Sequence, residues 1–97
     1  MAIGMFMDWR GVTAEQYDDV RRGVNWETDV PRGALFHAAT FDSNGAHIFD
    51  MWESAEDFQR FVDERLTPGT QAAGLRGEPD VRVFDIHATF TPAFQPA

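Results

Sequence analysis

The sequence predicts an α+β fold of the ferredoxin-like type, with the element order β-α-β-β-α-β. Two capping boxes mark the helix starts, because Thr13 and Ser54 are each followed three positions later by a polar partner, Gln16 and Asp57. The turn Asp42–Gly45 joins two alternating stretches into a hairpin. Right-handed connections then give a four-stranded antiparallel sheet in the order 4-1-3-2, with two helices on one face.

The first half of the chain supplies one strand and one helix. Residues 2–9 are apolar on nearly both sides, so we expect a central strand there. The helix after Thr13 carries a single buried stripe, made of Tyr17, Val20 and Val24. The loop 26–33 begins with Trp26, for which two interpretations stay open: it closes the end of the core, or it covers a pocket.

The central hairpin is expected to pair residues 34–41 with residues 46–52, with Gly45 in the left-handed region as a bulge. This turn places Asp42 opposite Ala46. One face of the hairpin then carries Phe36, Ala38, Thr40, Ile48, Asp50 and Trp52. The other face carries His37, Ala39, Phe41, His47, Phe49 and Met51. A slip of one residue would scramble these sets.

The second helix begins after Ser54 and buries a stripe made of Phe58, Phe61, Val62 and Leu66. We expect the run Thr67-Pro68-Gly69 to end it, with one more short turn over residues 70–74. The last strand is predicted at residues 81–91, and Pro92 and Pro96 are expected to end the ordered chain.

Length and aromatic content together predict a homodimer. Ninety-seven residues make one domain, 1–97, with a core of limited size. Yet 13% of the residues are aromatic, and a monomer this small has difficulty covering so many rings. The face of the sheet without helices is expected to carry Phe36, Ile48 and Trp52, and a second copy packed on that face would bury it.

Charge and composition exclude several classes of function. The formal net charge is −8, so phosphate backbones would repel the chain and we expect no nucleic-acid partner. All eight positive residues are arginine, which removes Schiff-base chemistry by lysine. The absence of cysteine removes thiol nucleophiles and disulfides, and fits the cytoplasm. The apolar stretch at the N-terminus is too short for a membrane span and lacks the basic region of a signal peptide.

The end of the third predicted strand carries a family resemblance. Asp50-Met51-Trp52-Glu53-Ser54, followed by Phe58 and Phe61, is similar to a strand-end pattern of the antibiotic-biosynthesis-monooxygenase-like group in the dimeric α+β barrel superfamily. A set of small, uncharacterised actinobacterial members looks closer still. That likeness includes Gly11–Tyr17, Gly33–Ala38 around His37, Trp52–Leu66 with Pro68, and the late His87. It covers nearly the whole chain.

The resemblance implies a small-molecule pocket between sheet and helices, one per subunit. Activities in this superfamily include cofactorless oxidation of polyphenols, polyketide cyclisation, haem degradation and muconolactone-type isomerisation, so the motifs identify the fold better than the reaction. Haem-degrading members use an axial histidine after the second helix, and residues 67–77 contain none. Related cyclases often use a histidine there too, which weakens that interpretation.

Two histidines are the candidate catalytic residues. His37 and His87 are predicted on strands among apolar neighbours, and either alone could act as a general base on a bound phenol. The competing interpretation is a core histidine that donates to a backbone carbonyl or to water. The strand order would keep the two apart by three strand spacings, roughly 14 Å. His47, close to the hairpin turn, is expected at the surface.

Asp50 is the carboxylate that needs an explanation. It is predicted in mid-strand among apolar neighbours, where an unpaired charge is unfavourable. Either an arginine such as Arg82 or Arg10 reaches it across the dimer, or its pKa is raised by burial and it acts as a base. Pocket-shaping residues are expected to be Tyr17, Trp26, Phe49 and Phe61.

The pattern of histidines does not support a metal site, and we expect no cofactor. The leading hypothesis is a homodimer that binds a small apolar or aromatic molecule as a cofactor-independent monooxygenase, isomerase or cyclase. The alternatives are a non-catalytic small-molecule-binding protein and a purely structural dimer.

Overall fold

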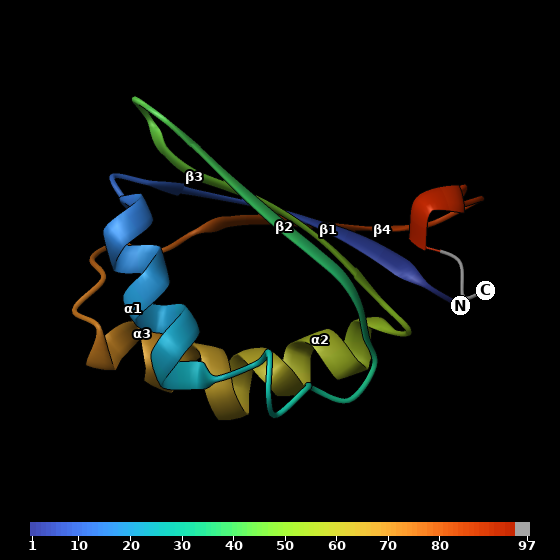
Figure 1. Cartoon of the computed structure of the whole chain (residues 1–97), viewed down its shortest axis with the longest axis horizontal. Coiled ribbons are helices and arrows are strands. Elements are labelled where there is room, and N and C mark those ends of the chain that lie inside the picture. The colour runs from blue at the N-terminus through green and yellow to red at the C-terminus, as the bar shows by residue number, and fades with distance from the viewer. Residues whose placement is uncertain (95–97) are drawn as a thin grey trace.

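The computed structural model describes residues 1–94 and has the predicted architecture. Four strands form one antiparallel sheet: β1 (Ile3–Arg10), β2 (Ala34–Asp42), β3 (Gly45–Trp52) and β4 (Asp80–Asp85). Their spatial order is β2-β3-β1-β4, as predicted. The helices α1 (Ala14–Val24), α2 (Ala55–Phe61) and α3 (Thr67–Ala72) all lie on one face of the sheet (Figure 1). A short 3-10 turn follows at Pro92–Phe94.

Both predicted caps position the helices. Thr13 accepts from the backbone N–H of Gln16, and the Gln16 side chain accepts from the backbone N–H of Thr13. The Ser54 hydroxyl accepts from the backbone N–H of Asp57 at 3.1 Å. Since these bonds satisfy N–H groups that the first helical turn leaves free, both helices begin at the predicted residues.

The prediction that Thr67-Pro68-Gly69 ends the second helix is wrong. The helix continues from α2 through a π-helical turn, Val62–Leu66, into α3. In that turn the N–H of Thr67 bonds to the carbonyl of Val62, five residues back. Pro68 therefore falls in the first turn of α3, where its missing N–H is tolerated. Gly69 lets α3 approach α1, because a Cβ there would collide with the side chain of Val24.

The predicted hairpin register is wrong by one residue. Asp42 pairs with Gly45 and Ala38 pairs with Phe49, so the loop holds only two residues, Ser43 and Asn44. Gly45, at φ 131°, is the first residue of β3, and a Cβ there would collide with the backbone at the end of β1. The side chains of residues 36–42 therefore lie on the opposite face from the one predicted relative to β3, whereas a register shift before Phe36 leaves Ala34 opposite Trp52.

The corrected register changes which residues the helices cover. Ile48 and Trp52 lie on the helix-facing side of the sheet, and Trp52 is buried there. We had expected both on the uncovered face. The buried core consists of Ile3, Met5, Met7, Trp9, Val12, Val20, Val24, Ala46, Trp52, Phe58 and Phe61.

The uncovered face of the sheet carries a different set of rings. Adjacent ring centroids lie 5.1 to 6.1 Å apart in what we call the outer phenylalanine cluster: Phe6, Phe36, Phe49, Phe84 and Phe94. Gly4 makes room for it, because a Cβ there would collide with the ring of Phe84. Phe6 and Phe84 are each 40% exposed and Phe94 is 69% exposed. The prediction of an apolar uncovered face is thus confirmed. Of the three residues predicted on it, only Phe36 lies there.

The last strand is shorter than predicted. It ends at Asp85, which pairs with Ile3, the first residue of β1. One more backbone bond joins Ile86 to Ala2 at 3.1 Å, after which β1 offers no further partner. His87 therefore lies beyond the strand rather than on it. The expectation for Pro96 lies outside the described residues. None of the helices in residues 1–94 is long and apolar enough to cross a bilayer.

His47 connects the hairpin to β1 through two carboxylates. Its Nδ1 lies 2.6 Å from Asp8 on β1, and its Nε2 lies 2.9 Å from Asp42 as an ion pair. The hydrogen bond to Asp8, followed by the contact with Asp42, raises the pKa of His47. A raised folded-state pKa stabilises the fold at low pH, where the histidine is charged in both states.

We therefore expect wild-type stability to fall relative to a His47→Gln variant as pH rises above about 6.5 and through the raised pKa of the folded state. Urea unfolding at a fixed protein concentration between pH 5 and pH 9 would measure this. Parallel stability curves for the two proteins would show that His47 does not couple to folding.

Candidate functional site

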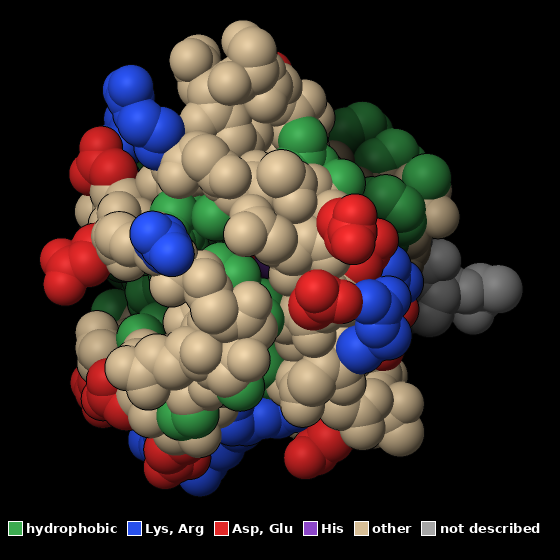
Figure 2. Space-filling view, turned by 90° about the vertical axis from the view of Figure 1, so that its left-hand side faces the viewer, with side chains coloured by type: hydrophobic (Ala, Val, Ile, Leu, Met, Phe, Trp, Pro, Cys, Tyr) green, Lys and Arg blue, Asp and Glu red, His purple; other side chains and the backbone are tan. Residues whose placement is uncertain are grey.

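A cavity lies between the helix-facing side of the sheet and the helices. Its volume is about 250 Å³, slightly below the range of about 300–1,000 Å³ typical of small-molecule sites. Apolar and aromatic side chains dominate its lining, among them Met5, Met7, Val20, Leu35, Ile48 and Phe61. Figure 2 looks onto the end of the molecule that holds α1 and α3, where apolar side chains show in furrows of the surface.

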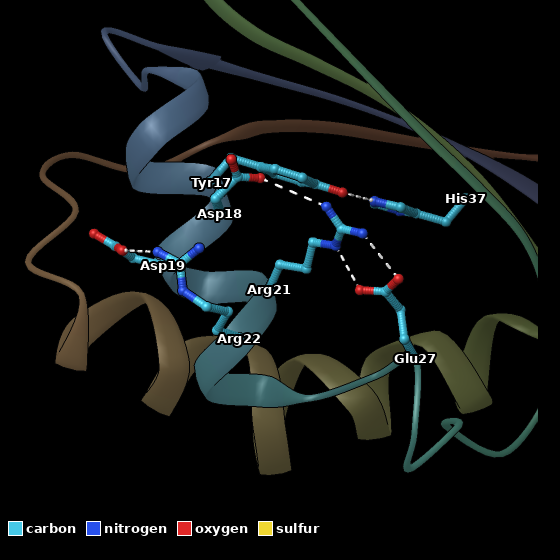
Figure 3. Close-up of polar contacts among 7 residues, drawn as sticks. All are labelled: Tyr17, Asp18, Asp19, Arg21, Arg22, Glu27 and His37. Atoms are coloured by element: carbon cyan, nitrogen blue, oxygen red, sulfur yellow. Dashed lines mark hydrogen bonds and ion pairs between the residues drawn. The ribbon is translucent and has the colours of Figure 1, made fainter.

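Three polar side chains from three elements form a hydrogen-bonded chain along this cavity. Tyr17 on α1 places its hydroxyl 2.6 Å from Nε2 of His37 on β2, as Figure 3 shows. Nδ1 of His37 lies 2.6 Å from Oδ1 of Asp50 on β3. The indole N–H of Trp52 donates to the other oxygen of Asp50 at 3.1 Å. The cavity is lined by all four residues.

The direction of each bond follows from which atoms can donate. The Trp52 indole can only donate, so Asp50 accepts there, and an ionised carboxylate also accepts from His37. Nδ1 of a neutral His37 then carries the proton, and Nε2 accepts from the hydroxyl of Tyr17. Burial raises the pKa of Tyr17 to about 12, so its phenol keeps the proton at neutral pH.

Aromatic rings hold the Tyr17–His37 contact in place. The planes of the two rings are nearly parallel, with an interplanar angle of 3°. Trp26 packs against both, with its centroid 5.8 Å from Tyr17 and 5.2 Å from His37. Phe41 meets Tyr17 edge-on at 5.5 Å. Of the two interpretations of Trp26, its position on the cavity wall over the polar pair fits the one in which it covers a pocket.

Charged residues at the rim stand beside this contact. The guanidinium of Arg21 bonds to Glu27 through two nitrogens and lies 3.7 Å from Asp18 (Figure 3). Its positive charge lowers the pKa of Tyr17 and so opposes the larger effect of burial. The hydrogen bond from Arg21 lowers the pKa of Glu27. Arg21 is thus held close to the phenol by two carboxylates.

The structure brings together some of the predicted site residues and separates others. Tyr17, Trp26, Phe61 and His37 line the cavity. Phe49 lies on the opposite side of the sheet, in the outer phenylalanine cluster. His87 is exposed, beyond the end of β4, and is not among the lining residues.

The pairing of His37 with Asp50 is what the sequence reasoning missed. Within one chain, the partners of Asp50 are His37 and Trp52 rather than an arginine, and Arg82 lies over the ring of Phe6 on the other face. The sequence contained a signal for this pairing. In a hairpin with a two-residue loop, His37 and Asp50 lie equally far from the two ends of the loop and so stand opposite each other. In residues 1–94, no group of three or more histidine and acidic side chains could hold a metal ion.

Comparisons with known proteins support the fold. No protein-family model and no curated protein matches the sequence. A Nitrosomonas europaea protein of unknown function is similar in structure, with a TM-score of 0.72 at 15% identity over 94% of both chains. SnoaB, a cofactor-independent oxygenase from Streptomyces nogalater, has a TM-score of 0.63 at 11% identity, covering 91% of this chain and 94% of that one.

A third similar structure contains a ligand. It is the ActVA-Orf6 monooxygenase of Streptomyces coelicolor in complex with Nanaomycin D, with a TM-score of 0.58 at 17% identity, covering 94% of this chain and 91% of that one. These similarities show that the chain has the ferredoxin-like fold of dimeric α+β barrel structures. At such identities they do not establish its reaction.

Removing the carboxylate should destabilise the fold. In Asp50→Ala, the buried indole N–H of Trp52 loses its acceptor, at about 1–3 kcal/mol for an unsatisfied buried group. Nδ1 of His37 also loses its acceptor, and this costs less because the His37 side chain is 32% exposed to water. Urea unfolding would measure the loss. Asp63→Ala is the matched control, because the Asp63 side chain is exposed and accepts a surface hydrogen bond from Gln59, and we expect a change within about 0.5 kcal/mol. Equal unfolding free energies for the two variants would contradict the conclusion that Asp50 satisfies His37 and Trp52.

Proposed function

We propose that the cavity binds a small, largely apolar, aromatic molecule with an acidic hydroxyl, and that His37 and Asp50 together remove its proton. The observation that carries this proposal is the hydrogen-bonded chain of Tyr17, His37 and Asp50 on the wall of an apolar cavity. The reaction class is a cofactor-independent oxidation, isomerisation or cyclisation that begins from the deprotonated substrate.

The geometry suits a histidine base. Asp50 orients the imidazole through Nδ1 and would stabilise the imidazolium that forms when Nε2 takes a proton. The lining of the cavity is largely apolar, which strengthens electrostatic interactions along its wall. Proton removal makes an aromatic hydroxyl compound electron-rich, which activates it for a reaction that begins from the deprotonated substrate.

Two of the similar structures support the choice of substrate class. SnoaB is described as a cofactor-independent oxygenase, and the ActVA-Orf6 structure holds Nanaomycin D. A second candidate function is binding without catalysis. The observation that favours it is the occupied Nε2 of His37, which leaves no free ring nitrogen for a bound molecule.

Substitution of His37 tests the catalytic proposal. We expect His37→Gln to lower the turnover of naphthols and dihydroxynaphthalenes by about 10²- to 10⁴-fold, the usual contribution of a general base. Turnover would be followed by dioxygen uptake and by product mass. Binding should change little, and it can be followed by fluorescence quenching because Trp9, Trp26 and Trp52 line the cavity.

The variant His87→Gln separates the two candidate histidines and should keep the wild-type rate, because His87 lies outside the cavity. Full activity of His37→Gln would exclude the base assignment. Binding of these compounds without turnover by the wild type would favour the non-catalytic function.

We also propose that a second copy of the chain covers the outer phenylalanine cluster. Several large rings gather there on a sheet face that none of the α-helices in residues 1–94 covers, and exposed apolar patches of this kind mark interfaces. A symmetric dimer would place the same face of each copy against the other. A cysteine-free chain is compatible with the cytoplasm, which we propose as its location.

An acidic side chain on that face should separate the copies. We expect the wild type to sediment as a dimer and Phe6→Asp as a monomer, because a buried unpaired charge is unfavourable. Val83→Asp is the control, since it adds the same charge to an exposed residue on the other side of the sheet. A monomeric wild type in sedimentation equilibrium would refute the dimer.

A further inference from the structure

The hydrogen bonds of His37 leave it no direct route to a substrate. Its Nδ1 is engaged by Asp50 and its Nε2 by Tyr17, each at 2.6 Å. An imidazole has only these two nitrogens, so neither is open to a molecule in the cavity. A base in this arrangement must either lose the Tyr17 contact or work through it.

The hydroxyl of Tyr17 has the capacity that His37 lacks. A phenol oxygen donates one proton and accepts through its lone pairs. The donor is used toward His37, and among residues 1–94 nothing donates to the oxygen. Tyr17 lines the cavity, so this oxygen is an acceptor at the end of the chain that is available to a bound hydroxyl group, whereas Asp50 at the other end is almost fully buried.

Packing opposes the alternative, in which a substrate pushes Tyr17 aside. The ring packs against Trp26 and Phe41, and its plane is nearly parallel to that of His37. To swing away, Tyr17 would have to give up these ring contacts together with its hydrogen bond. The arrangement therefore favours a tyrosine that stays in place when the cavity is filled.

We propose that Tyr17 is the catalytic residue that contacts the substrate hydroxyl and passes its proton to His37. This inference rests on the proposed function. The substrate O–H bond breaks as its proton bonds to Oη of Tyr17, while the Tyr17 proton moves to Nε2 of His37. The electron pair of the broken bond stays on the substrate oxygen. Tyr17 ends as a neutral phenol, and His37 ends as an imidazolium beside the Asp50 carboxylate.

Arg21 is a positioning residue for this transfer. Its guanidinium is fixed by Glu27 and Asp18 at the rim, and its charge acts on the Tyr17 oxygen. Negative charge that develops there during the transfer is stabilised by this cation. The raised pKa of Tyr17 disfavours a free phenolate, so the two proton movements are expected to occur together.

The test uses p-nitrophenol as the probe, because its phenolate absorbs visible light and its phenol form does not. We would titrate the protein-bound probe with pH in the wild type, Tyr17→Phe and His37→Gln. The inference expects both variants to raise the pKa of the bound probe by at least about one unit, a tenfold lower ratio of phenolate to phenol. Tyr17→Phe keeps the ring and removes only the hydroxyl. Urea unfolding of each variant would verify that it folds.

Each other outcome overturns a defined part of the argument. If His37→Gln raises the probe pKa but Tyr17→Phe does not, the substrate contacts His37 directly and the role of Tyr17 is refuted, while the proposed function stands. If neither variant changes the pKa of the bound probe, the role of Tyr17 and the proposed function both fail. If the wild type does not bind p-nitrophenol, the aromatic cavity and the inference fail together. If Tyr17→Phe does not fold, nitrogen NMR of His37 in the wild type tests the inference instead. Addition of the probe should then leave the hydrogen bond between Nε2 of His37 and Tyr17 in place.

Discussion

Asp50 places a carboxylate in the middle of a strand that is otherwise packed against the core. Only 6% of this residue is exposed, so an unpaired charge there would strongly oppose folding. Its two oxygens are satisfied by His37 from the neighbouring strand and by Trp52 from its own strand. The Asp50 carboxylate is therefore satisfied only when the hairpin register, the orientation of the His37 imidazole and the burial of the Trp52 indole are all as observed.

The two faces of the sheet have different chemical tasks. The helix-facing side combines an apolar cavity with one ordered polar chain, which is the composition of a ligand site. The outer side carries the phenylalanine cluster, with the contacts of His47 to Asp8 and Asp42 at its hairpin end, and none of these three polar residues lines the cavity. Because side chains alternate along each strand, neighbouring positions such as Phe49 and Asp50 serve these separate tasks.

Much of the fold could be predicted from local signals. The caps at Thr13 and Ser54, the hairpin turn and the apolar stripes each act over a few residues, and together they give the element order and the strand order. The candidate site could be predicted only as a list of residues. Whether His37 lies on the same side as Asp50 depends on a loop of two residues rather than three, and composition does not distinguish these lengths. The end of β4 likewise depends on where its partner β1 begins.

The π-helical turn before α3 has a consequence for how this chain tolerates changes in length. One residue fewer between Val62 and Leu66 would restore regular α-helical bonding. The π-turn accommodates its extra residue in about the rotation that four residues make in an α-helix, so α3 would keep its orientation toward α1. Gly69 would therefore stay in its close contact with Val24. A single deletion in this turn should thus be tolerated better than one elsewhere in the helix, where everything that follows would turn by about 100° around the axis.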